Sequence, residues 1–198
     1  MKIRALIILL LSFSIPVFSQ IYPFSYFSVK NGLPNSMVNQ TFQDSKGNIW
    51  FATQGGLDMF NGTIHKKFNK ESGIVGINIT SVTEDKNGAI WIGTSEGASK
   101  YEEGKFTNYT TANGLKSNFI NHVMCDSKNQ IWFSTNEAGI AVYNNGQFRH
   151  LNTQNGLTSD IVFSISESSD KKIWVATRRG GICVLKDDKV IAVYNPDN

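Results

Sequence analysis

Short apolar segments alternate with turn-forming residues along most of this chain. The first four segments are rich in β-branched, aromatic and other apolar side chains and cover residues 38–42, 49–53, 57–60 and 64–68. Between them lie Asp44 to Asn48, the Gly55-Gly56 pair and Asn61-Gly62, and Asn-Gly is a strong hairpin signal. No helical periodicity appears. The pattern predicts four antiparallel strands joined by tight turns.

The same unit occurs four times. All four tryptophans lie in it, each three residues before a threonine and 18 residues after a glycine, and the steps between them are 41, 41 and 42 residues. A period of this size is typical of propeller blades or helical arrays, and the glycine-rich turns inside every unit exclude the helical array. The predicted fold is all-β, a β-propeller region over residues 20–198 with four-stranded blades at 32–72, 73–113, 114–155 and 156–198.

We call the four strands of a repeat A to D, and strand B carries the tryptophan. Strand B reads Ile49-Trp50-Phe51 in the first repeat, without polar alternation. A strand that is apolar on both sides is covered on both sides, as happens when a blade is packed between two neighbours. We therefore predict that the tryptophans are packing residues, each contributing about 2–3 kcal/mol on burial, rather than exposed sugar platforms.

An aspartate stands six residues before the tryptophan in three repeats, as Asp44, Asp85 and Asp126, whereas the fourth repeat has Ser168. This position opens the A–B turn. A carboxylate there accepts backbone N–H groups as an Asx-turn, so we predict a structural role rather than a catalytic one.

The first 19 residues have the layout of a signal peptide. Lys2 and Arg4 precede an apolar run over 5–18, and small residues lead to cleavage before Gln20. The alternative is a membrane anchor, but the run is shorter than the roughly 20 residues that span a bilayer. We expect the mature chain to be exported to the periplasm.

Both ends of the repeat array suggest an incomplete ring. Residues 21–29 predict a lone D strand, of the kind that completes the last blade of a closed propeller. The chain ends at Asn198, where the repeat spacing would place the next glycine one residue later. The prediction is a truncated, partial or split gene product whose two outer blade faces are uncovered.

Charge and reactive side chains exclude several classes of function. The chain has 19 Lys and Arg against 16 Asp and Glu, and two of the basic residues lie in the predicted leader, so nothing favours nucleic acid as a partner. Cys125 and Cys183 are predicted to be buried thiols rather than a disulfide. The three histidines occupy unmatched repeat positions and are predicted at the surface or in turns; they are His65, His122 and His150. We predict no metal, no cofactor and no catalytic residue.

Ligand contacts, if the propeller binds a ligand, should come from the B–C loops, which vary most between repeats and share one face with the D–A loops. The candidate residues are Gln54, Glu96, Asn136, Glu137, Arg178 and Arg179. The two arginines could pair with a carboxylate or sulfate on an acidic sugar. The alternative is a solvated turn.

Residues 32–38 and 44–62 resemble the two-component regulator propeller repeat, and the resemblance extends over residues 21–198. Ala98-Ser99 and Ser168 depart from the family pattern. The resemblance implies seven-bladed propellers, often two in tandem, in the periplasmic sensor region of histidine kinases and hybrid two-component systems. It also implies a following immunoglobulin-like domain, an inner-membrane helix and a cytoplasmic kinase, none of which this sequence contains.

Three functions follow as hypotheses. The first is the N-terminal part of a non-enzymatic periplasmic sensor of oligosaccharides, whose partners are the remaining blades and the kinase region of the same system. The second is a scaffold for protein docking, including a homodimer. The third is a propeller lyase or glycosidase, which would need a cluster of histidines or carboxylates on one face.

Overall fold

The computed structural model describes residues 25–195, which form sixteen strands in four four-stranded antiparallel sheets. Each sheet is one repeat, with its strands adjacent in chain order. This confirms the predicted propeller architecture. The first and second blades consist of β1 (Val38–Gln43), β2 (Ile49–Thr53), β3 (Gly56–Phe60) and β4 (His65–Phe68), then β5 (Ile79–Glu84), β6 (Ile90–Thr94), β7 (Gly97–Glu102) and β8 (Lys105–Tyr109).

The third and fourth blades repeat this order. They consist of β9 (Ile120–Cys125), β10 (Ile131–Thr135), β11 (Ile140–Asn144) and β12 (Gln147–Leu151), then β13 (Val162–Glu167), β14 (Ile173–Thr177), β15 (Gly181–Lys186) and β16 (Lys189–Tyr194). Short 3-10 turns stand before three of the repeats, as η1 (Val29–Asn31), η2 (Lys70–Ser72) and η3 (Thr153–Asn155).

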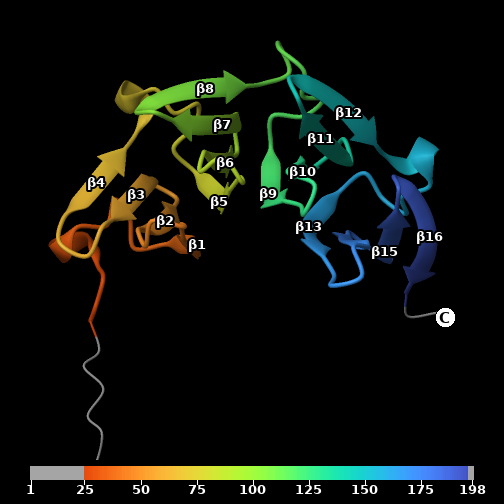
Figure 1. The fold of residues 1–198 in the computed structure, drawn as a ribbon, viewed down its shortest axis with the longest axis horizontal. Helices are drawn as coiled ribbons and strands as arrows, with labels where there is room; N and C mark the ends of the chain where they lie inside the picture. Colours follow the sequence, from red (N-terminus) through yellow and green to blue (C-terminus); the bar gives the residue numbers. More distant parts are fainter. Residues whose placement is uncertain (1–24, 196–198) are drawn as a thin grey trace, which may run out of the picture.

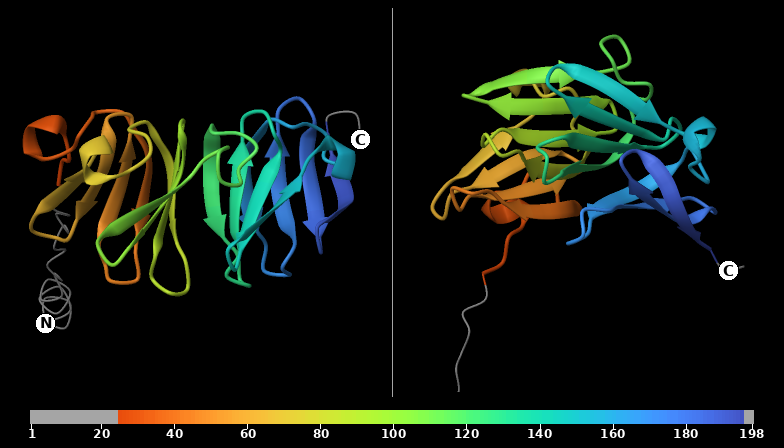
Figure 2. Two further views of the ribbon diagram at one scale, coloured as in Figure 1. Left: turned by 90° about the horizontal axis from the view of Figure 1, so that it is seen from above. Right: turned by 45° about the vertical axis from the view of Figure 1, so that its right-hand side comes forward.

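The four blades stand side by side in an arc, with strand A of each blade toward the centre and strand D on the outside (Figure 1). The neighbouring A strands β1, β5, β9 and β13 are in contact in that order. The turns gather at the two ends of the sheets, as the edge-on view of Figure 2 shows. We call the end with the B–C turns and D–A connections the upper rim, and the end with the A–B and C–D turns the lower rim.

The tryptophans fill the spaces between blades. Trp50, Trp91 and Trp132 are only 2–3% exposed, and the Trp50 ring lies 6.0 Å from that of Tyr101 in the next blade. The residue after each tryptophan points the other way. Ile92, for example, joins the apolar cluster around Trp50 of the preceding blade. Strand B is therefore covered on both sides, which confirms the predicted packing role.

The recurring aspartates support both the turn and the tryptophan. Asp44 Oδ1 accepts the N–H groups of Lys46 and Asn48 at 3.0 and 2.8 Å, as predicted, and Asp44 Oδ2 accepts the Trp50 indole N–H at 2.9 Å. Burial alone would raise the pKa of Asp44, but the bonds from Asn48 and Trp50 outweigh it and lower that pKa. The constant six-residue spacing between Asp and Trp is the sequence signal for the indole bond.

The fourth blade has one uncovered side in the described part of the chain. Ile182 is 40% exposed, whereas its counterparts Leu57, Ala98 and Ile140 are fully buried. Trp174 remains half-buried and stacks on Tyr194 at 5.8 Å. The same repeat positions that form the core between blades thus form an apolar surface here.

The N-terminal segment differs from its prediction. The signal peptide over 1–19 lies outside the described residues. Of the predicted D strand over 21–29, residues 25–28 have no strand conformation and η1 begins at Val29. A strand needs an open strand edge to pair with, and each described sheet already has its own strand D.

This segment nevertheless keeps the repeat register. Phe27 lies five residues before Gly32, as Phe68 lies five before Gly73. Phe27 packs on Phe60 at 5.2 Å between ring centroids, and Phe68 packs on Tyr101, the counterpart of Phe60, at 5.1 Å. Phe27 therefore covers the outer side of the first blade, as Phe68 and Tyr109 cover the second and third blades and Leu151 covers the fourth.

The two cysteines are free, as predicted. Cys183 is fully buried, and Cys125 is half-buried with a pKa that burial raises to about 11. The histidines were predicted at the surface or in turns; none lies in a turn, and all three are partly exposed residues on strands: His65 on β4, His122 on β9 and His150 on β12. The residues next to them in the sequence did not show which way the strand register turns each ring.

Candidate functional site

The six candidate residues all lie in the four B–C turns on the upper rim, and all six are exposed. The recurring threonine builds these turns. Thr53 Oγ1 donates to the Gly56 carbonyl at 2.7 Å and accepts the Gly55 N–H at 3.2 Å, and Thr94 makes the same pair of bonds with Gly97 and Glu96. The threonine hydroxyl thus closes the turn and leaves the following side chains free to vary.

A backbone bond ties each B–C turn to the start of strand A. The residue after the threonine donates its N–H to the residue just before strand A, as Asn136 does to Phe119 at 3.1 Å and Arg178 to Ile161 at 2.9 Å. The predicted sharing of one face by B–C and D–A loops is confirmed. The residues before strand A were missed from the sequence, although they recur five positions after the repeat glycine; they are Met37, Asn78, Phe119 and Ile161.

The longer turns of the third and fourth blades need glycine at their ends. Gly181 has φ +74°, and a Cβ there would lie 2.0 Å from the Tyr194 carbonyl oxygen. Arg179 also has a positive φ, +58°. The extra residue is therefore accommodated by left-handed backbone within the turn, which orients the arginine pair.

No hydrogen bond or ion pair joins any two of the six candidate side chains in the described structure. Glu96 pairs with Lys70 at 2.6 Å, and Glu137 accepts the Ser117 hydroxyl at 3.3 Å. The structure brings the six residues to one rim but not into one cluster. A ligand touching several of them would have to extend across neighbouring blades.

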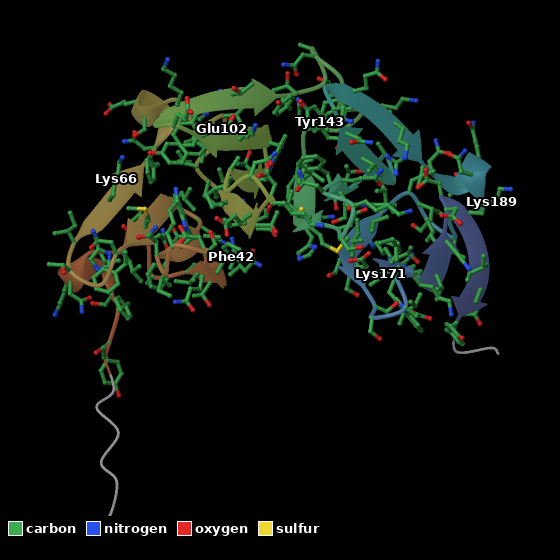
Figure 3. The ribbon with its side chains drawn as sticks, viewed as in Figure 1. Phe42, Lys66, Glu102, Tyr143, Lys171 and Lys189 are labelled. Atoms are coloured by element: carbon green, nitrogen blue, oxygen red, sulfur yellow. The ribbon has the colours of Figure 1, made fainter. Side chains whose placement is uncertain are left out.

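Two cavities open on the opposite, lower rim between blades. One of about 330 Å³ lies between the first two blades and is lined by Asp44, Trp50, Tyr101 and Glu102, among others. The other, of about 250 Å³, lies between the last two blades, where Arg149 pairs with Asp188 at 2.7 Å. Figure 3 shows Lys66, Glu102 and Tyr143 on the outer parts of their blades. None of the six candidate residues lines either cavity.

One carboxylate–imidazole pair lies in the first blade. Asp58 is fully buried, and its Oδ2 lies 2.6 Å from His65 Nδ1, while its Oδ1 has no partner among the described residues. Burial raises the pKa of Asp58 although the bond to His65 opposes this. No group of three or more His, Cys, Asp or Glu side chains in the described part of the chain could hold a metal ion.

His122 gives a pH prediction. Its Nδ1 is buried without a partner in the described structure, and burial lowers its pKa. The unfolded chain therefore binds the proton more tightly, so this residue lowers stability as the pH falls from about 6.5 through the folded-state pKa. We expect urea unfolding of the full chain to show this loss between pH 7 and pH 5.

The matched variant is His122→Gln, because Gln40 stands at the same position of the first repeat and accepts the Val82 N–H at 2.6 Å. This variant should gain about 1 kcal/mol at pH 7 by making the equivalent bond and should flatten the acid slope. His150→Gln is the comparison: burial lowers the pKa of His150 too, but the bond between its Nε2 and the Gly114 carbonyl opposes this, so its removal should flatten the acid slope less. An unchanged slope in His122→Gln would contradict the assignment.

Comparison with known proteins adds family information. The family model described as "Two component regulator propeller" matches residues 32–55, 73–96 and 114–137. No curated protein matches the chain.

In the described residues, no helix has the length and apolar character needed to cross a membrane.

Several solved structures are similar. The extracellular domain of a protein assigned as the hybrid two-component system BT3049 from B. thetaiotaomicron is 26% identical, with a TM-score of 0.76 over 88% of this chain and 26% of that one. Virginiamycin B lyase from Staphylococcus aureus is 18% identical, with a TM-score of 0.65 over 83% of this chain and 58% of that one. PorZ, a surface component of the type-IX secretion system of Porphyromonas gingivalis, is 14% identical, with a TM-score of 0.64 over 88% of this chain and 30% of that one.

These similarities differ in weight. The lyase and PorZ share the fold alone at such identities. The present chain spans about a quarter of the length of the two-component relative.

Proposed function

Because this chain carries the repeats of the two-component regulator propeller family, we propose that it is part of a ligand-sensing propeller in the periplasmic region of a two-component sensor. Three matched repeats and the similarity to an extracellular domain of a hybrid two-component system support this proposal. The sensor binds its ligand without transforming it. The remaining blades and the kinase that transmits the signal belong to other regions of the same system.

The proposed ligand is an oligosaccharide that contacts the upper rim. The B–C turns there share one backbone design while their exposed side chains differ in every blade, from Gln54 to Glu96 and Arg178. This combination of a constant frame and variable contacts is what loops on a rigid scaffold provide for recognition. The single observation that carries the sensor proposal is the family match, because fold alone does not define function.

Thermal-shift and calorimetric screening of the full chain against a panel of oligosaccharides tests the proposal. We expect at least one glycan to raise the melting temperature, since a ligand that binds only the folded state stabilises it by mass action. Product analysis after incubation provides the control for turnover. Cleavage of any glycan would replace the sensor with a lyase or glycosidase, and the absence of any shift would favour the docking scaffold.

A further inference from the structure

We propose that the upper rim of the third and fourth blades binds an anionic oligosaccharide, with Phe119 stacking on a sugar ring and Arg178 and Arg179 pairing with carboxylate or sulfate groups. This inference rests on the proposed function and names the class of ligand. It assigns a role to Phe119, which lies outside the B–C turns, and it requires the arginine pair and the aromatic ring to share one surface.

Phe119 presents an aromatic ring from a fixed backbone. Phe119 is 39% exposed, although most aromatic residues in the described part of the chain are wholly or partly buried. The Phe119 N–H donates to Ser117 Oγ at 3.2 Å, and the Phe119 carbonyl accepts the Asn136 N–H at 3.1 Å. An aromatic side chain held in this way offers a large apolar contact at low entropic cost.

The arginine pair is free to bind an external anion. Arg178 and Arg179 are exposed, and within the described residues neither guanidinium makes a hydrogen bond or ion pair. The other described arginine, Arg149, is bound to Asp188 through two of its nitrogens. Guanidinium groups bind carboxylates and sulfates through two parallel hydrogen bonds. The positive φ of Arg179 sets the direction in which the pair leaves the turn.

Two hydrogen bonds connect the ring and the arginines across the blade boundary. Asn121 Nδ2, two residues after Phe119, donates to the Val162 carbonyl at 2.7 Å. Ile161, next to Val162, accepts the Arg178 N–H at 2.9 Å. The Phe119 end of β9 and the Arg178 turn therefore lie side by side on the same rim. Their placement on two blades suits a ligand of more than one sugar unit.

The carboxylates of this rim are already hydrogen-bonded. Glu137 accepts the Ser117 hydroxyl, and Asp160 accepts the Thr153 N–H at 2.7 Å and its hydroxyl at 3.3 Å. The carboxylate oxygens thus accept hydrogen bonds from within the chain, whereas the guanidiniums of Arg178 and Arg179 have no such partners in the described structure. The carboxylates keep their charge but already have neutral donors of their own, so the charged donors left open to a ligand are the two guanidiniums, and these favour an anionic acceptor on the sugar.

Calorimetry of the full chain with a matched pair of probes tests this inference. The probes are a galacturonate tetrasaccharide and its fully methyl-esterified, uncharged form; a heparin tetrasaccharide is the sulfated probe. We expect an anionic probe to bind at least about tenfold more tightly than the uncharged ester. Arg178→Gln combined with Arg179→Gln should abolish this preference, and Phe119→Ala should weaken the binding of every probe by about tenfold.

Lys105→Gln, an exposed change on β8, is the control for general loss of positive charge, and Phe119→Leu retains an apolar side chain if the alanine variant fails to fold. Stronger binding of neutral glycans would overturn the inference and leave the proposed sensor intact. An arginine variant that binds anionic probes as the parent does would also overturn it. Failure of every glycan, charged or neutral, would remove the proposed function together with the inference.

Discussion

Replacing Trp91 by alanine is expected to lower the free energy of unfolding by about 3–5 kcal/mol, because a large side chain is lost from a space that cannot collapse. The Trp91 ring stacks on Tyr109 at 5.5 Å within its own blade and lies 5.1 Å from Tyr143 of the next one. Lys100 Nζ lies over the ring, 5.7 Å from its centroid. Urea unfolding followed by circular dichroism measures the loss without depending on tryptophan fluorescence.

Trp174→Ala is the matched control for this result. Trp174 occupies the same repeat position, but no described blade covers it, and it stacks only on Tyr194. Its removal should cost about 1–2 kcal/mol, since less apolar area is exposed. Equal losses in the two variants would mean that the tryptophan stabilises its own blade and contributes little between blades.

Replacing Asp85 by alanine is expected to cost about 2–4 kcal/mol, the second-largest loss. The Asp85 carboxylate accepts the buried Trp91 indole N–H at 2.7 Å and the N–H groups of Asn87 and Ala89 at 2.9 and 3.1 Å. Each lost charged acceptor leaves a buried donor without a partner, which costs more than the bond itself contributed. Thermal unfolding by circular dichroism measures the effect.

Asp170→Ala provides the comparison in the fourth blade. Asp170 is in the corresponding turn, but it is exposed and contacts Ser168 and Lys172 rather than a tryptophan. We expect the Asp170→Ala variant to melt at the same temperature as the parent protein. A small loss in Asp85→Ala, similar to that of Asp170→Ala, would show that water replaces the carboxylate at the indole.

The inter-blade packing and the upper rim are connected through the turns. Strand B carries the tryptophan into the core and ends at the threonine whose hydroxyl closes the B–C turn, as Thr135 does with Gly139 at 2.9 Å. A rigid strand therefore positions variable side chains at its end. This arrangement allows the side chains of the rim to vary without altering the core.

The repeat pattern was sufficient to predict the four blades, their strand order and the packing role of Trp50 and its counterparts. The reason is physical: a strand has a side-chain period of two, and a repeat with constant spacings must place equivalent residues at equivalent positions. Turn chemistry supplied the rest, since Asp, Asn and Gly have conformational preferences that act over a few residues. The sequence also located the variable B–C turns on one face.

Tertiary structure decided what depends on contacts between strands, both within a blade and across the boundary to the next one. The pairing of Asp58 with His65 arises from the register of β4 beside β3, and the burial of His122 arises from the strands packed around β9. Phe27 kept its repeat position without forming a strand, because strand formation requires a partner edge that no local signal encodes. Phe119 became a candidate contact only when a backbone bond placed it beside Asn136 on the rim. Local preference determined the elements, and the pairing of strands and the packing of blades determined which side chains meet.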